Sequence, residues 1–137
     1  MKTLTLILFL FTFALSANAQ NRAGIVGDWH VKVFEDHENG QNYYTNVDFK
    51  ARVNFSKGGL YRGSRLCNGI GGVYKIEGNT LQFMQSGSFT KINCTGANAA
   101  IENAFRAFNQ QLTLEEEGSD FYIILPGKFK MLLSRFP

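Results

Sequence analysis

The residues best suited to chemistry in this chain are its only two cysteines, Cys67 and Cys94. Free thiols can bind a metal or react with a substrate, whereas two cysteines in an oxidising compartment normally pair as a disulfide. Two sulfurs without a pair of histidines nearby do not complete a zinc site. The chemistry of Cys67 and Cys94 therefore depends on the compartment to which the chain is sent.

The first 19 residues have the three zones of a cleaved secretory signal peptide. Lys2 supplies the charged start, an apolar run extends from Leu4 to Leu15, and Ala17-Asn18-Ala19 is a cleavage site of the small-x-small type. The apolar run is shorter than the roughly 20 residues that a transmembrane helix needs, and no later segment is long and apolar enough to span. We expect the mature chain to begin at Gln20.

Export to an oxidising compartment predicts a disulfide between Cys67 and Cys94. Closing a loop of this length removes about 3 to 4 kcal/mol of unfolded-state freedom in the chain-entropy model. No cysteine lies directly after the cleavage site, where a lipoprotein carries its lipid-modified cysteine. We therefore expect a soluble exported protein, periplasmic or extracellular, and not a lipoprotein. Residues 20–137 have the length of a single domain.

The other titratable residues form no recognisable catalytic motif. The two histidines, His30 and His37, lie outside the nucleophile, zincin and phosphate-transfer patterns. His30, His37 and the acidic segment from Glu35 to Glu38 are close in sequence and could hold a metal ion. His30, however, occupies an outward strand position, and the other residues are typical of a solvated loop. Glu102 alone cannot act as both the general acid and the general base of a catalytic site. We therefore expect no enzyme, metal or cofactor, with a hydrolase using Glu102 and one histidine as the weakest alternative.

Two features argue against nucleic-acid and nucleotide binding. The 14 basic and 11 acidic residues are spread along the chain, whereas a nucleic-acid groove needs clustered cations. The glycines of Gly69-Ile70-Gly71-Gly72 lead into an alternating strand pattern and not into a helix, so they predict a tight turn or bulge and not a phosphate loop. A mildly basic surface can touch anionic lipid or polysaccharide, but a solvated exterior is the simpler interpretation.

The remaining patterns predict an α+β domain, with an antiparallel, strongly curved or barrel-like sheet of seven to eight strands and one amphipathic helix packed on or closing it. The expected strands are Gly27–Val33, Val47–Phe55, Leu60–Leu66, Val73–Ile76, Thr80–Met84, Leu112–Glu116, Phe121–Leu125 and Phe129–Leu133. Val47–Phe55 alternates most clearly, and in the first strand Trp29, Val31 and Val33 are expected to point inward. Apolar residues at helical spacing predict a helix between Ala97 and Phe108, with Thr95 as its cap.

These elements carry a set of spaced residues that resembles the META domain, the family of HslJ. The matching residues are Gly27 and Trp29 in the opening strand, Gly63, Cys67, Asn68, Gly72 and Tyr74 in the centre, Thr90 and Cys94 before the helix, and Glu102 and Phe105 within it. One departure is Leu66, where the family commonly has glycine. The resemblance implies a small exported β-rich domain linked to heat and stress responses, without an established reaction.

Each of these motif residues also has a structural interpretation from its own chemistry. Asn68 can hydrogen-bond its own turn and tolerates a left-handed backbone. Tyr74 can bury its ring while its hydroxyl finds a partner. Thr90 can cap a turn beside the disulfide, and Glu102, early in the predicted helix, suits the positive end of the helix dipole.

The leading functional hypothesis is a non-catalytic binding module that contacts an envelope protein or other envelope component and supports envelope integrity under stress. The thirteen phenylalanines leave an alternative open, because some of them could line a cavity and not the core. The protein would then carry an apolar or lipid ligand, or act as a pilot-like chaperone for an outer-membrane protein. The resemblance of the family to lipid-binding secretion pilots supports this alternative. The sequence leaves the oligomeric state open.

Overall fold

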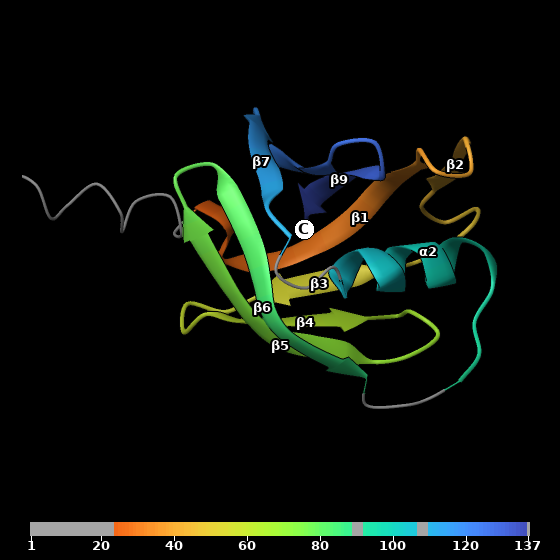
Figure 1. The fold of residues 1–137 in the computed structure, drawn as a ribbon, viewed down its shortest axis with the longest axis horizontal. Helices are drawn as coiled ribbons and strands as arrows, with labels where there is room; N and C mark the ends of the chain where they lie inside the picture. Colours follow the sequence, from red (N-terminus) through yellow and green to blue (C-terminus); the bar gives the residue numbers. More distant parts are fainter. Residues whose placement is uncertain (1–23, 89–91, 107–109, 137) are drawn as a thin grey trace, which may run out of the picture.

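The computed structural model describes residues 24–88, 92–106 and 110–136. In these residues the chain forms nine strands and the helix α2 (Figure 1). The elements are β1 (Gly27–Asp36), β2 (Gln41–Tyr44), β3 (Arg52–Phe55), β4 (Leu60–Ser64), β5 (Ile70–Glu77), β6 (Thr80–Ser88), α2 (Gly96–Phe105), β7 (Leu112–Glu117), β8 (Asp120–Leu125) and β9 (Phe129–Arg135). The predicted signal peptide and the new N-terminus at Gln20 lie outside the described residues.

The sheet closes into an antiparallel barrel. Its order is β2-β1-β3-β4-β5-β6-β7-β8-β9, and β1 also pairs with β9. Eight strands form the ring, while β2 is an additional strand on β1. The long strand β1 makes this possible, because β3 pairs with its first half and β2 with its second half on the same edge. The predicted α+β class and barrel-like sheet are confirmed, with one more strand than expected.

A β-bulge divides β1 into two halves with different inward residues. The register against β9 shifts between Val31 and Val33. Trp29 and Val31 are buried as predicted, but Val33 is only half-buried and Phe34 takes the next inward position. The prediction for Val33 was wrong because a bulge adds one residue and reverses the alternation beyond it. The strand then continues to Asp36, three residues past the predicted end.

The predicted strand Val47–Phe55 is a strand only in its second half. Its inward positions from Phe49 to Phe55 are buried as expected, but pairing begins at Arg52. Val47 is 83% exposed, and the preceding Asn46 has a φ of 64°. The apolar alternation therefore predicts the buried residues from Phe49 onward correctly, but its first part lies in a loop and not in a strand. The short strand β2 carries no apolar alternation, and the sequence analysis missed it.

The glycine-rich segment is part of a strand and not a turn. β5 begins at Ile70, and Gly71 and Gly72 pair with β4 on one side and β6 on the other. The irregularity lies one residue later, between Val73 and Tyr74. On the facing strand, a Cβ at Gly63 would lie 2.6 Å from the Ile70 side chain, so glycine is required there for close packing.

Aromatic rings fill the barrel around α2. Trp29, Phe55, Tyr74, Phe83 and Phe105 are fully buried. β6 and β7 pair over only two residues, and α2, which lies between them in the sequence, packs Phe105 against Phe83 at 5.8 Å between ring centroids. Among the described phenylalanines only Phe136 is exposed, so the prediction that most are core residues is confirmed for this part of the chain. No helix in the described residues is long and apolar enough to cross a membrane.

Candidate functional site

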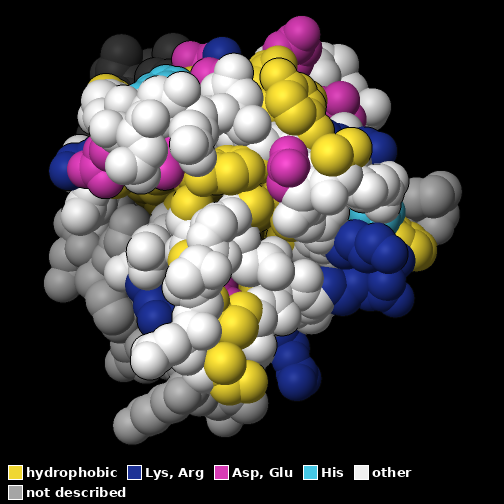
Figure 2. Space-filling model, turned by 90° about the vertical axis from the view of Figure 1, so that its right-hand side faces the viewer, with side chains coloured by type: hydrophobic (Ala, Val, Ile, Leu, Met, Phe, Trp, Pro, Cys, Tyr) yellow, Lys and Arg dark blue, Asp and Glu magenta, His cyan; other side chains and the backbone are white. Residues whose placement is uncertain are grey.

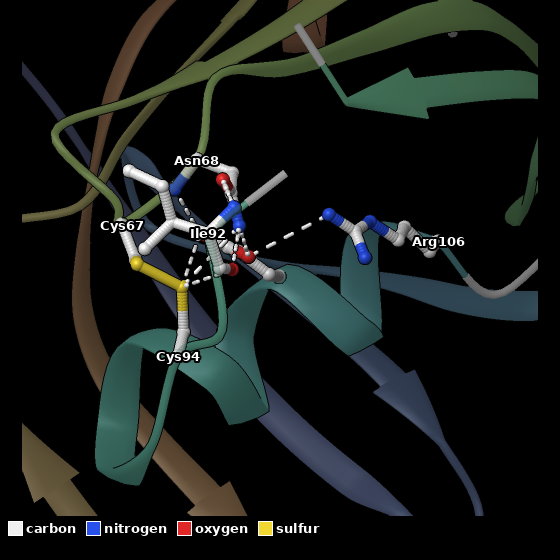
Figure 3. The surroundings of a disulfide bond; sticks show 6 residues. Cys67, Asn68, Ile92, Cys94 and Arg106 are labelled. Carbon is white, nitrogen blue, oxygen red and sulfur yellow. Dashed lines mark hydrogen bonds and ion pairs between the residues drawn. A yellow bond between two sulfur atoms is a disulfide. The ribbon is translucent and has the colours of Figure 1, made fainter. Parts of the chain in front are cut away.

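The predicted disulfide between Cys67 and Cys94 is present. It joins the connection between β4 and β5 to the segment that leads into α2 (Figure 3). Thr95 follows directly and occupies the N-cap position of α2, but its side chain makes no capping hydrogen bond. Thr90, the other motif residue of this segment, lies outside the described residues. The disulfide therefore holds the N-terminus of α2 against the barrel, and the helix begins there without a side-chain cap.

Asn68 connects three segments beside the disulfide (Figure 3). Its side-chain amide donates to the Ile92 carbonyl at 2.9 Å and to Glu102 Oε2 at 3.1 Å, while its Oδ1 accepts from the Ile92 amide at 2.9 Å. The sequence analysis proposed a bond of Asn68 within its own turn, whereas these partners are distant in sequence, so Asn68 also links separate segments. The left-handed backbone near this connection is at Arg65, with a φ of 55°.

Glu102 is the carboxylate at the centre of this group of residues. It is 3% exposed, and its Oε1 accepts a hydrogen bond from the backbone amide of Asn68 at 2.5 Å. Arg106, the C-cap residue directly after α2, places its guanidinium 3.6 Å from Oε2. The predicted interaction with the positive end of the helix dipole was wrong, because α2 begins at Gly96 and Glu102 lies in its second half. A buried carboxylate requires such partners, and here they come from another segment and from Arg106.

The same residues offer little to a metal ion or a substrate. One ligand atom each from Cys67, Cys94 and Glu102 lies within 4.8 Å of the others. The two sulfurs are bonded to each other, so they are not the thiolates that a soft metal requires. The carboxylate is already engaged by Asn68 and Arg106. We conclude that the Asn68–Glu102 cluster, comprising Cys67, Asn68, Cys94, Glu102 and Arg106, holds α2 in place.

The remaining motif residues are structural where the structure describes them. Tyr74 is buried and its hydroxyl donates to the Ser56 carbonyl at 2.6 Å, as predicted. The Trp29 indole donates to the Ile25 carbonyl at 2.7 Å. A Cβ at Gly27, whose φ is 132°, would lie 2.4 Å from the Arg135 guanidinium. These contacts fix the barrel and leave no reactive group exposed among these residues.

The histidines and acids near β1 do not gather into a metal site. His37 pairs with Glu35 at 3.0 Å in the exposed turn after β1. Asp36 is buried and its Oδ1 accepts from the Glu38 amide at 3.1 Å, so it caps this turn and is not solvated as expected. His30 instead stacks on Phe136 outside the barrel. In the described residues the carboxylate of Glu102 pairs with Asn68 and Arg106 and with neither histidine, so the hydrolase alternative has no geometric support.

A cleft of about 500 Å³ lies between α2 and the ends of β1, β8 and β9. Phe34, Tyr43 and Phe129 contribute aromatic surface, and alanines of α2, including Ala100, form the opposite wall. Hydrophobic side chains show between polar groups on this side of the molecule in Figure 2. The sequence reasoning missed the cleft, because its walls come from segments far apart in the chain. The only signal was the run of small residues on α2.

The comparisons with known proteins agree with this fold. The model of the META domain matches residues 24–127. An NMR structure of a protein from Burkholderia xenovorans is 16% identical, with a TM-score of 0.61 over 87% of this chain and 88% of that one. A second NMR structure is 12% identical, with a TM-score of 0.61 over 81% and 92% of the two chains.

A crystal structure of a DUF4847 family protein from Bacteroides vulgatus ATCC 8482 is also similar. It is 14% identical, with a TM-score of 0.58 over 85% of this chain and 97% of that one. No curated protein matches the chain. At these identities the likeness to the solved structures establishes the fold alone.

Proposed function

The chain belongs to the META domain family, and from this premise we propose that it is an exported, non-catalytic binding module that holds its partner in the cleft beside α2. The signal-like N-terminus and the disulfide support export. The observation that carries the binding role is the contrast within the described residues. The chemically capable side chains of the Asn68–Glu102 cluster have internal partners. The cleft, in contrast, is open to solvent, and half-buried apolar side chains lie among its polar groups, namely Tyr43, Ala100 and Leu125.

The cleft suits a segment of a partner protein that inserts an apolar side chain. Phe34 and Phe129 stack at 5.6 Å between ring centroids and line the cleft, but both are buried. The apolar surface within reach of a partner comes from the half-buried Tyr43 and Leu125. Ala100 on α2 is small and half-buried, which leaves room above it. Asn39 and Asn103 at the rim supply donors and acceptors for the main chain of the segment. An apolar anchor inside a polar rim is the usual organisation of a protein-binding site.

A carrier of an apolar ligand, or a pilot-like chaperone, is the second candidate. A volume of about 500 Å³ is within the range for small-ligand sites. The buried rings of Trp29, Tyr74 and Phe105 occupy the described barrel interior, so a ligand would lie in the cleft and not inside the barrel. The charged rim groups Arg106 and Lys128 favour a segment of protein over a fully apolar molecule.

Native mass spectrometry of the mature protein from the envelope of its own host tests the proposal. We expect a protein-sized adduct on the wild type that is lost from Ala100→Trp, because the indole fills the cleft. Leu60→Trp is the matched control, since Leu60 is 57% exposed at the β3–β4 hairpin, away from α2 (Figure 1). Both variants should unfold at similar urea concentrations.

Three results separate the alternatives. A lipid-sized adduct lost from Ala100→Trp would favour the carrier function. An adduct that survives in Ala100→Trp, or no adduct on the wild type, would contradict binding in the cleft. The proposed role in envelope stress is tested separately by a deletion strain, which should grow poorly under heat or antibiotic stress and recover with the wild-type chain.

A further inference from the structure

Positive charges gather around His30 on the outside of the barrel. His30 on β1 pairs in register with Arg52 on β3, so both side chains point outward. Lys50 lies two residues before Arg52 and is exposed. Lys32 lies two residues after His30 on β1, and Arg65 directly follows Ser64, the residue of β4 that pairs with Arg52. Burial lowers the pKa of His30, and the positive charges of Arg52, Lys32 and Arg65 lower it further. We call Lys32, Lys50, Arg52 and Arg65 the basic patch.

The cations of the basic patch have no acidic partner within ion-pair distance in the described residues. The ion pairs found there involve other cations, such as Lys75 with Glu77 and Lys128 with Glu38. Asp28, two residues before His30 on β1, accepts a hydrogen bond from the Asn54 side chain at 2.9 Å. Figure 2 shows Lys and Arg side chains crowded on one side of the view, with the Asp and Glu side chains mostly along its upper part.

Exposed apolar side chains border the same cations. The loop from Tyr44 to Lys50 begins beside Lys32, because the Thr45 amide donates to the Lys32 carbonyl at 3.0 Å. In this loop Tyr44 is 50% and Val47 is 83% exposed. On the other side of the patch, Phe136 is 39% exposed. Its ring stacks on His30 at 4.5 Å and lies 3.8 Å below the Arg52 guanidinium.

We propose that the basic patch, together with Tyr44, Val47 and Phe136, docks the protein on the surface of an anionic phospholipid bilayer. Cations without acidic partners are attracted to lipid phosphates, and apolar side chains among them enter the interface. A soluble polyanion would use the cations but gains little from an exposed valine. None of the four cations lines the cleft, so docking is independent of the function proposed for it.

Vesicle sedimentation tests the docking surface with the processed chain purified from an exporting host. The wild type should bind vesicles of mixed phosphatidylglycerol and phosphatidylcholine, bind those of phosphatidylcholine alone far less, and detach as salt rises. Each cation near an anionic surface contributes roughly fivefold in binding. The double variant Lys50→Gln with Arg65→Gln should therefore bind on the order of 30-fold more weakly.

The matched control is Lys57→Gln with Lys75→Gln, which removes the same charge from exposed positions outside the basic patch and should bind nearly as well as the wild type. Equal weakening of both double variants would overturn the basic patch as the docking surface. Val47→Ser should weaken vesicle binding several-fold while leaving the urea unfolding curve unchanged. If Val47→Ser binds like the wild type while Lys50→Gln with Arg65→Gln does not, a bilayer is the wrong partner and a soluble polyanion is the better one.

Discussion

The Asn68–Glu102 cluster and the basic patch use charge in opposite ways. In the cluster a single carboxylate, 3% exposed, is surrounded by hydrogen-bond donors from Asn68 and by Arg106. In the patch several cations lie together around His30 without an acid in ion-pair distance among the described residues. Charge with internal partners stabilises the fold, whereas charge without them is available to a partner molecule. The residues that looked most reactive in the sequence therefore belong to the architecture.

Removal of the disulfide should have the largest effect on the cluster. In the variant Cys67→Ala with Cys94→Ala, the free energy of unfolding should fall by about 3 to 4 kcal/mol, because the unfolded chain regains its loop freedom. Urea titration followed by tryptophan fluorescence measures this change, since Trp29 is the only tryptophan and is fully buried. Unchanged stability would mean that the cluster holds α2 without help from the bond.

Glu102→Ala should have the next largest effect, about 3 kcal/mol, because it leaves the buried Asn68 donors and Arg106 without their acceptor. Asn103→Ala is the matched comparison, one residue along α2 and exposed, and should change the free energy of unfolding by less than about 0.5 kcal/mol. Equal losses in the two variants would contradict a special role for the buried carboxylate. Urea unfolding of both variants in parallel gives the comparison.

His30 should give the smallest effect, and it depends on pH. Its folded pKa is lowered by burial and by Arg52, Lys32 and Arg65, so its contribution to stability is complete above the unfolded pKa of about 6.5 and is lost as pH falls below that value. The wild type should therefore lose more stability between about pH 7.5 and pH 5 than His30→Gln does. Urea midpoints across this range measure the difference.

The other histidine, His37, is unchanged between the two proteins, so the comparison isolates His30. Parallel pH profiles for the wild type and His30→Gln would contradict the crowding of positive charge around His30. A profile that differs as expected would show that folding lowers the pKa of His30, through burial first and the neighbouring cations after it.

Predictions from local patterns were correct for which residues are buried. They were incomplete for the bounds of the strands, which depend on pairing with other strands. The alternation from Phe49 to Phe55 identified inward residues, although only the last four form a strand. The helical spacing located α2, but not that Glu102 would lie in its second half. The structural interpretation of Tyr74 was confirmed to the level of its hydroxyl, because a buried phenol requires a partner wherever the chain supplies one.

The sequence by itself determined the α+β class, most of the strands, the helix and the pairing of the two cysteines, since periodicity and cysteine number are local or compositional properties. Only the tertiary structure decided where β1 bulges, which segment satisfies Glu102, and that α2 leaves a cleft beside β1, β8 and β9. The reason is physical. A buried charge and an open cleft depend on which distant segments meet, and that is set by closure of the barrel and not by neighbours in the chain.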